Sequence, residues 1–458
     1  MQTLPIELRQ KIFRQLNKHS QFNCLLINRQ LCREVVSILW EAPLSIRNVK
    51  GAKVINAYIK NFSNETWRYL LANGISKKSI TGPPAFNYAS FLCVYDPILV
   101  NCAAEDWLRC KCKSPSAEKC NVLRDSLCQL FLAEMKSMRS LTFDSFHPDQ
   151  FWSSIPKERS TSLLLKNLNQ IFIIGIAKGL DNLFQELAKN CQNIGGITLY
   201  CDCNPNIRIT KQLENTAIGL KKTILAQNGL QWLKLYETSA ILFRFISSFY
   251  SSSTTIRAIE LNKVDLILLQ SDNVLEALSF CENLGCLKIL GCKNLNQQYW
   301  SEIARFFKKL EYLSISVVQR EIPVKFLEQI FISAGDNLKY LSITYSSIIN
   351  SSILDRLLPL FSCYLYNLRA LEMQGLDLKN AVSSLRSCKK LQYLAVYQDI
   401  FSRNNVLDTL IEVFPTLEFL IIRDFSDINV TYSLVEKKKA ERKYDVKMNV
   451  SANYFHES

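Results

Sequence analysis

Several kinds of residue and motif are scarce or missing in this chain, and each absence excludes a class of protein. No apolar run approaches the roughly 18 residues that a membrane-spanning helix needs. Histidine occurs only three times in 458 residues, and none of the three stands in a nucleophile, metal or acid-base pattern. Glycine-rich phosphate loops and the HExxH and GxSxG motifs are absent. We therefore expect a folded, non-catalytic protein that needs no cofactor and does not enter a membrane.

The N-terminal segment also lacks the uninterrupted apolar stretch of a secretory signal. Glu7, Arg9 and Lys11 interrupt it. We therefore expect an intracellular protein, located in the cytoplasm, the nucleus or both.

An intracellular location predicts that the 16 cysteines are free thiols, because a reducing compartment prevents disulfide formation. Cys110, Cys112, Cys120 and Cys128 fall around a Lys-rich segment that we expect to be an exposed loop. The first spacing is tighter than zinc sites usually have and no histidine lies nearby, so no metal site is expected. Four other cysteines recur at repeat positions and are predicted to be small buried apolar groups. They are Cys191, Cys281, Cys292 and Cys388.

The net charge of +14 is unevenly distributed. Residues 1–140 hold 20 basic and 10 acidic side chains, whereas residues 141–432 hold 29 and 27. Nucleic-acid binding needs several Lys or Arg on one surface, and the basic residues of the first third are scattered. We therefore do not expect a nucleic-acid partner.

A short apolar pattern repeats from Met138 to Ile422, with an apolar residue followed at plus three and plus five by two more. Most steps between successive copies are 23 to 30 residues, and one is 36. This period predicts leucine-rich repeats, in which each unit supplies one strand to a parallel sheet and returns through a helix. The central residues of the eleven copies are Leu141, Ile171, Ile197, Leu233, Ile259, Leu287, Leu313, Leu341, Leu371, Leu394 and Leu420.

The first 44 residues have a different pattern, because Leu4, Leu8, Ile12 and Leu16 recur every four residues on one helical face. Two further short apolar segments follow, at residues 22–27 and 31–40. Three helices of this size bury little surface alone, so part of their surface is expected to be an interface.

These residues carry a resemblance. LPIELRQKIFRQL at residues 4–16, then Ile27, then Leu39 and Trp40, resemble an F-box, and the repeats downstream resemble the F-box and leucine-rich-repeat class of ubiquitin ligase substrate receptors. The resemblance implies that the helices bind the acidic Skp-type adaptor of an SCF-type cullin-RING ligase, and through it a cullin, while the repeats bind an unknown target protein. It assigns adaptor contacts to Leu4, Pro5, Leu8, Ile12, Leu16, Ile27, Leu39 and Trp40. The alternative is that these helices only cap the open end of a repeat scaffold or ligand-sensing protein.

Residues 45–137 are less regular, and we expect helices at 51–62, 65–75 and 120–135. The predicted fold is thus an α/β leucine-rich-repeat solenoid, a horseshoe of parallel sheet and helices, preceded by an all-α F-box module. The predicted domains are residues 1–44, a helical connector at 45–137, the solenoid at 138–432 and a charged tail or cap at 433–458. The Lys-rich stretch at residues 435–446 fits either a nuclear import signal or a solvated cap.

Alternation along each strand sends the residue before the central apolar position to the concave face of such a solenoid. In the last eight rungs five of these residues are aromatic, and two further tyrosines lie four positions later. We interpret these rings either as anchors for the target or as a ladder that stacks along the sheet. They are Trp232, Tyr236, Tyr312, Tyr340, Tyr393, Tyr397 and Phe419.

Overall fold

The computed structural model describes residues 4–46, 50–77, 82–111, 115–144, 163–175, 180–200, 211–237, 253–266, 278–295, 297–317, 323–345, 351–374, 376, 378–397, 413–414, 416–423 and 431–432. The chain divides into two units. One holds residues 1–256 and 272–277, and the other holds residues 257–271 and 278–458.

The first unit begins with helices and ends with parallel strands. Its helices are α1 (Ile6–Gln15), α2 (Lys18–Cys24), α3 (Arg29–Leu39), α4 (Gly51–Tyr58), α5 (Asn64–Ala72), α6 (Pro97–Lys111), α7 (Ala117–Glu134), α10 (Leu180–Asn190) and α11 (Lys211–Leu225). Short 3-10 turns lie at Pro43–Ser45, Ile59–Asn61 and Tyr88–Phe91. Its strands are β1 (Val94–Tyr95), β2 (Ser140–Asp144), β3 (Gln170–Ile174), β4 (Gly196–Tyr200) and β5 (Trp232–Tyr236).

Polar side chains start several of these helices. Asn17 accepts a hydrogen bond from Ser20 N at the start of α2, and Asn28 accepts one from Leu31 N at the start of α3. Ser116 does the same for α7. Each cap satisfies a backbone N–H that has no partner inside its helix, so these residues define where the helices begin.

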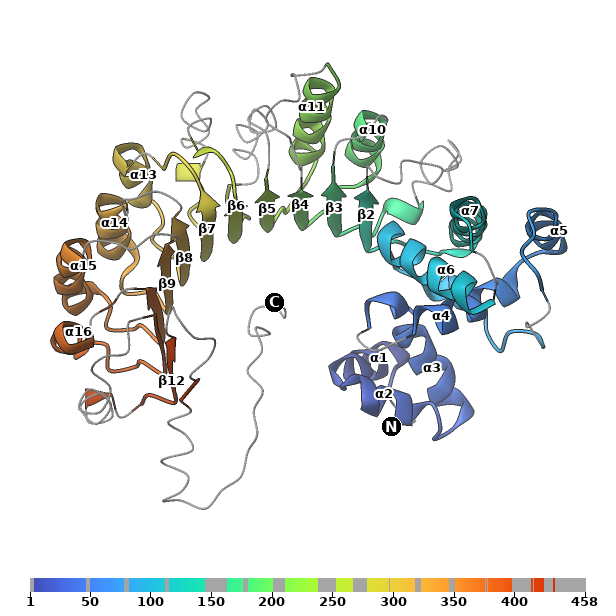
Figure 1. The fold of residues 1–458 in the computed structure, drawn as a ribbon, viewed down its shortest axis with the longest axis horizontal. Helices are drawn as coiled ribbons and strands as arrows, with labels where there is room; N and C mark the ends of the chain where they lie inside the picture. The colour runs from blue at the N-terminus through green and yellow to red at the C-terminus, as the bar shows by residue number, and fades with distance from the viewer. Residues whose placement is uncertain are drawn as a thin grey trace. The chain divides into compact units, whose positions relative to one another are not determined.

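The strands of the first unit pair in chain order and in parallel, from β1 to β5. Leu141, Ile171, Ile197 and Leu233 are register partners across β2, β3, β4 and β5. Helices α10 and α11 lie on one side of these strands (Figure 1). The first four predicted rungs are therefore confirmed, in the predicted register.

The second unit repeats the arrangement. Its strands are β6 (Ala258–Asn262), β7 (Cys286–Cys292), β8 (Tyr312–Val317), β9 (Tyr340–Tyr345), β10 (Ala370–Gln374), β11 (Tyr393–Tyr397), β12 (Phe419–Arg423) and β13 (Thr431–Tyr432). Its helices are α13 (Gln297–Ala304), α14 (Val324–Ala334), α15 (Ser351–Tyr364) and α16 (Leu378–Leu385), which line one side of the strands (Figure 1). Strands β6 to β12 are parallel, and β13 is antiparallel to β12.

The remaining seven rungs are also in the predicted register, since Ile259 through Leu420 form one column of partners. Ten of the eleven central residues are at most 1% exposed, and the other, Ile259, is 2% exposed. Burying this column between strand and helix is what requires an apolar residue at every repeat. In each unit the chain is therefore an α/β leucine-rich-repeat fold with a parallel sheet.

The connector differs from its prediction in two places. The expected helices appear as α4, α5 and α7, and α6 was not expected. Cys110 lies in α6 and Cys120 is buried in α7, while residues 112–114 of the expected loop lie outside the described residues. Strand β1 was also not expected. It has only two residues, too short to show a period of two in the sequence.

No helix in the described part of the chain is both long enough and apolar enough to cross a membrane. The predicted tail or cap at 433–458 lies outside the described residues. The boundaries predicted near residues 44, 137 and 432 stay predictions.

Candidate functional site

The N-terminal helical module, which we define as α1, α2 and α3, has its own small core. Phe13 of α1 is 1% exposed and packs with Val35, Ile38 and Leu39 of α3. Leu16 and Trp40 pack against the edge of this cluster. The side of α1 that faces inward therefore carries Phe13, whereas Leu8 and Ile12 of the four-residue column are exposed.

A buried ion pair also joins α1 to α3. Arg9 Nε donates to Glu34 Oε2 at 2.8 Å and Arg9 Nη2 donates to Glu34 Oε1 at 2.6 Å. These hydrogen bonds hold the pKa of the Glu34 carboxyl below its usual value. Both side chains are nearly inaccessible, so the two-pronged pair fixes the angle between the helices.

The module also exposes large apolar residues. Leu8 is 45% exposed, Ile12 39%, Leu26 87% and Ile27 64%. Ile6 and Phe22 are exposed as well. Isolated apolar residues on a surface are ordinary, whereas six exposed ones within 22 residues are typical of a segment that meets a protein partner.

The structure divides the predicted adaptor residues into two groups. Pro5, Leu8, Ile12 and Ile27 are exposed, and Leu4 is partly so. Leu39, by contrast, is 3% exposed and belongs to the core, and Leu16 and Trp40 are half-buried against it. The motif itself does not distinguish the exposed group from the buried one.

Trp40 connects the module to the next helices. Its ring lies 5.3 Å from that of Tyr58, edge to face, and 4.1 Å from that of Tyr88. Burial raises the pKa of Tyr58, which keeps this phenol neutral. The aromatic cluster ties the end of α3 to α4 and to the segment before β1.

Glu41, the next residue, continues the sheet. Its carbonyl accepts hydrogen bonds from Cys93 N at 2.9 Å and Val94 N at 3.1 Å. The Cys93 carbonyl accepts from Arg139 N and Ser140 N in the same way, and the Arg139 carbonyl accepts from Asn169 N and Gln170 N. Glu41 thus stands one step before β1 in the same backbone ladder, and the module closes this edge of the sheet.

The strand face away from the helices, here called the helix-free face, carries the predicted aromatic column. In the first unit the Trp232 indole lies directly over Gly196 of the neighbouring strand. The Phe172 ring is 6.3 Å from that of Trp232, and Lys234 Nζ is 5.5 Å from the Trp232 ring. Tyr236 lies 6.4 Å from Tyr200, ring to ring.

In the second unit Tyr312 and Tyr340 stack, with ring centroids 4.1 Å apart and planes 3° apart. Lys288 Nζ lies 5.2 Å from the Tyr312 ring and 3.8 Å from Glu260 Oε2. Burial raises the pKa of Tyr312 to about 12. Within this pair the rings contact each other along the sheet, as the ladder interpretation expects.

Polar groups extend the stack. Tyr340 Oη donates to Glu372 Oε2 at 3.0 Å, and Ser342 Oγ donates to the same oxygen at 3.1 Å. Burial and the nearby Glu372 carboxylate raise the pKa of Tyr340 above its ordinary range. Tyr393 and Phe419 are register partners on β11 and β12 and are half-buried. The side chain of Tyr397 lies outside the described residues.

Some of these residues could have been found in the sequence and others could not. Phe172 occupies the strand position of Lys234 two rungs earlier, one residue after the central position, so it lies outside the predicted column. Alternation places that position on the same face, so examining it along the rungs would have included Phe172. Arg9 and Glu34 are 25 residues apart with no regular spacing between them, and only the packing of α1 on α3 brings them together.

The repeat cysteines are buried thiols, as predicted: Cys191, Cys281, Cys292 and Cys388 are at most 2% exposed. Burial raises the pKa of Cys191 and of Cys281 to about 12, which keeps both protonated and unreactive. Among the described residues no group of three or more His, Cys, Asp or Glu side chains is placed to hold a metal ion.

Comparisons with known proteins identify no family for this chain. No protein-family model matches the chain, and no curated protein does. Among solved structures, the chain is similar to the leucine-rich repeat-containing protein LegL7 from Legionella pneumophila, at 15% sequence identity and a TM-score of 0.37. The similarity covers 61% of this chain and 93% of that one. The leucine-rich-repeat architecture follows from the strand register and helix placement of this chain itself.

Proposed function

We propose that the chain is a substrate-recognition subunit of an SCF-type cullin-RING ubiquitin ligase. In this role the N-terminal helical module binds the acidic Skp-type adaptor, and the helix-free face binds the target protein. The chain itself catalyses no reaction and positions its target for a separate ubiquitin-transferring enzyme. A location in the cytoplasm or nucleus goes with this role.

The observation that carries the proposal is the set of exposed apolar residues in the module. Leu8, Ile12 and Ile27 match positions of the F-box-like motif and are accessible, although the module already has a core around Phe13. Leaving such side chains in water has a cost, because burying one fully is worth about 1.5–3 kcal/mol. A partner that covers them recovers this free energy, which is the usual reason for an exposed apolar patch.

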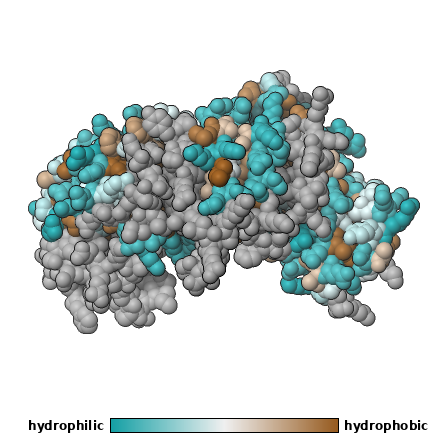
Figure 2. Space-filling view, turned by 90° about the horizontal axis from the view of Figure 1, so that it is seen from above, coloured by the Kyte–Doolittle hydropathy of each residue, from teal (hydrophilic) through white to brown (hydrophobic). Residues whose placement is uncertain are grey.

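The repeat surface suits a macromolecular target better than a small substrate. Its helix-free face presents large rings and mixed charges, including Trp232, Lys234 and Tyr236. Aromatic side chains contribute much of the binding energy at protein interfaces. On the helix side of the repeats, apolar residues are small patches separated by hydrophilic ones (Figure 2).

Co-purification with the adaptor tests the proposal. We expect the variant Leu8→Asp with Ile12→Asp to lose adaptor binding by about tenfold or more, since two buried contacts are replaced by desolvated charges. The same variant should keep the thermal midpoint of the wild type, because both side chains are exposed.

A matched control is available on α11. Ile218 is 54% exposed and Leu225 50%, so Ile218→Asp with Leu225→Asp introduces the same two charges at a surface that the proposal leaves free. Unchanged adaptor binding in the Leu8 and Ile12 variant, or equal loss in both variants, contradicts the proposal.

The alternative role is a repeat scaffold whose module only caps the sheet. The Glu41 carbonyl favours it, because it satisfies the N–H groups of Cys93 and Val94 at the sheet edge. Capping uses the Glu41 carbonyl and not the exposed apolar side chains, so the two roles are compatible. A chain that binds no adaptor but keeps its target would leave the cap as the module's whole function.

A further inference from the structure

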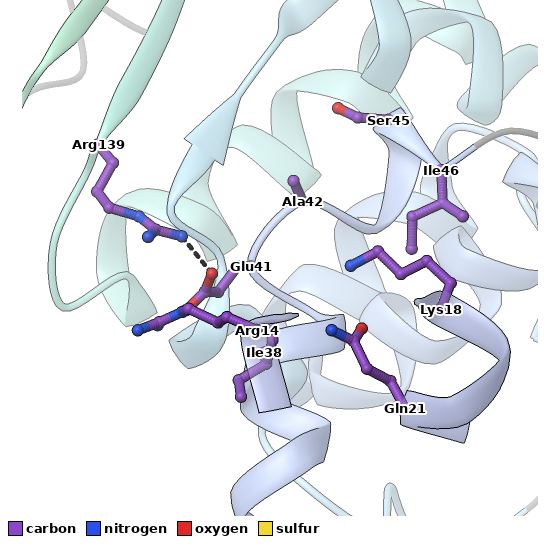
Figure 3. Close-up of a pocket in the computed structure, with 9 residues that line it drawn as sticks. All are labelled: Arg14, Lys18, Gln21, Ile38, Glu41, Ala42, Ser45, Ile46 and Arg139. Carbon is purple, nitrogen blue, oxygen red and sulfur yellow. Dashed lines mark hydrogen bonds and ion pairs between the residues drawn. The ribbon is translucent and has the colours of Figure 1, made fainter. Parts of the chain in front are cut away.

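A cavity of about 540 Å³ lies in the first unit, where the N-terminal helical module meets the start of β2. Arg14 of α1 and Lys18 and Gln21 of α2 line one part of it, and Glu41 and Arg139 line another (Figure 3). Its apolar wall is formed by residues such as Ile38 and Ile46. The volume is that of a site for a small molecule.

The lining is basic. Glu41 Oε1 accepts a hydrogen bond from Arg14, and Glu41 Oε2 accepts one from Arg139. One carboxylate thus serves two guanidinium groups, and each of these groups keeps further N–H donors, since a guanidinium has five. Lys18 has no ion pair recorded within the described residues, and its side chain extends toward the cavity (Figure 3). The three cations and one carboxylate leave a net charge of +2 around the cavity.

Gln21 provides an independent observation. It is 2% exposed, and its Nε2 donates to the Phe13 carbonyl at 2.8 Å. That hydrogen bond fixes which end of the amide is the nitrogen, and Oε1 lies beside the Lys18 side chain (Figure 3). Gln21 Oε1 is buried and has no hydrogen-bond partner in the described part of the chain. A buried acceptor without a donor is costly, which indicates a group that this chain does not itself supply.

We propose that this cavity binds a small soluble phosphate monoester that carries a hydroxyl group. The phosphate lies against Arg14, Lys18 and Arg139, and the hydroxyl donates to Gln21 Oε1. The exposed Lys18 side chain runs beside the Gln21 amide (Figure 3), so its movement toward the phosphate opens the path to Oε1. This site is separate from the exposed apolar residues and does not depend on adaptor binding.

A dianion suits the site better than a single carboxylate does. Two guanidinium groups favour two-pronged contacts with a phosphate, and a phosphate monoester offsets the net charge of +2. The neutral wall of Ile38 and Ile46 leaves room for the carbon part of the ligand. The ligand would contact α1, α2 and Arg139, the residue before β2. Its binding would therefore strengthen the link between the N-terminal helical module and the sheet.

Calorimetric titration of the full chain tests the proposal, with sn-glycerol 3-phosphate as the probe. We expect saturable binding that is about tenfold weaker in Lys18→Gln, because one charge-assisted contact is lost. Lys11→Gln is the matched control: Lys11 is an exposed lysine of α1 that does not line the cavity. Glycerol without the phosphate should not bind.

A second pair of variants tests the charge balance. Glu41→Gln should tighten binding, since it releases both guanidinium groups, whereas Glu7→Gln adds the same net charge outside the cavity and should not. Inorganic phosphate should bind more weakly than the ester, because it does not span the distance to Gln21. No saturable binding of the ester, equal weakening in Lys18→Gln and Lys11→Gln, or inorganic phosphate binding as tightly as the ester would overturn the proposal.

Discussion

Gly196 offers a sharp test of how neighbouring rungs hold the predicted anchor Trp232. A Cβ added at Gly196 would overlap the Cε2 and Cζ2 atoms of the Trp232 indole. Gly196 does not have a positive φ angle, so its backbone accepts alanine, and the indole alone excludes the methyl group. Gly196→Ala should therefore displace the Trp232 indole of β5 from its contact with β4.

The expected magnitude follows from two opposing effects. Forcing extra volume into a packed contact costs about 1–3 kcal/mol. Alanine in the middle of a strand is otherwise better than glycine by about 0.5–1 kcal/mol. In the wild-type background Gly196→Ala is thus expected to destabilise, and in a Trp232→Ala background to stabilise slightly. The coupling between the two changes is about 1–3 kcal/mol, because the gain of alanine over glycine is present in both backgrounds and cancels.

Urea unfolding followed by far-ultraviolet circular dichroism measures this coupling in a double-mutant cycle. Gly229→Ala serves as the control, because a Cβ at Gly229 meets nothing within 4 Å. That change should be neutral or slightly stabilising in both backgrounds. An equal cost of Gly196→Ala with and without the Trp232 indole would refute the claim that this ring is held by the neighbouring strand.

Two further predictions concern the tyrosine stack and the buried ion pair. Tyr312→Ala with Tyr340→Ala should lower the thermal midpoint without any target present, since a stacked pair contributes about 0.5–1.5 kcal/mol beyond its burial; loss of target binding at an unchanged midpoint would favour anchors over a ladder. The pKa of Glu34 is lowered in the folded chain, so the stabilisation by its pair with Arg9 is present above the unfolded-state pKa of about 4.3 and is lost as the pH falls through the folded-state pKa. Glu34→Gln should lower the midpoint at neutral pH and flatten its fall below about pH 5, whereas Glu7→Gln, the control, should leave that fall unchanged.

The repeat could be predicted because the same spacing of apolar residues recurs in every rung. Leu287 and Ile289 alternate with Lys288, and the same alternation recurs at Leu341 and Ile343. Alternation places apolar side chains on one face, and the constant step places them in one column. The parallel pairing and its register follow from those two regularities. All eleven predicted central residues therefore lie on the strands at which the pattern predicts them.

The helical module was predicted less completely. The four-residue spacing of Leu8 and Ile12 correctly indicates a helix, yet it does not tell which side of that helix faces the core. Phe13 and Arg9 take the inward side because α3 brings Val35 and Glu34 against them. Periodicity defines a face of an isolated helix, and its neighbours decide whether that face is buried or presented to a partner.

The sequence by itself determined the eleven repeat strands, their order and the residues that fill the sheet's core, since these depend on short, repeated spacing. The tertiary structure alone decided that Glu41 continues the sheet's backbone ladder, that Tyr312 stacks on Tyr340, and that Arg14, Lys18 and Arg139 surround one cavity. Arg14 and Arg139 are far apart in the chain and belong to different kinds of element. Contacts of this sort depend on how separate elements pack against one another, and no local spacing encodes them.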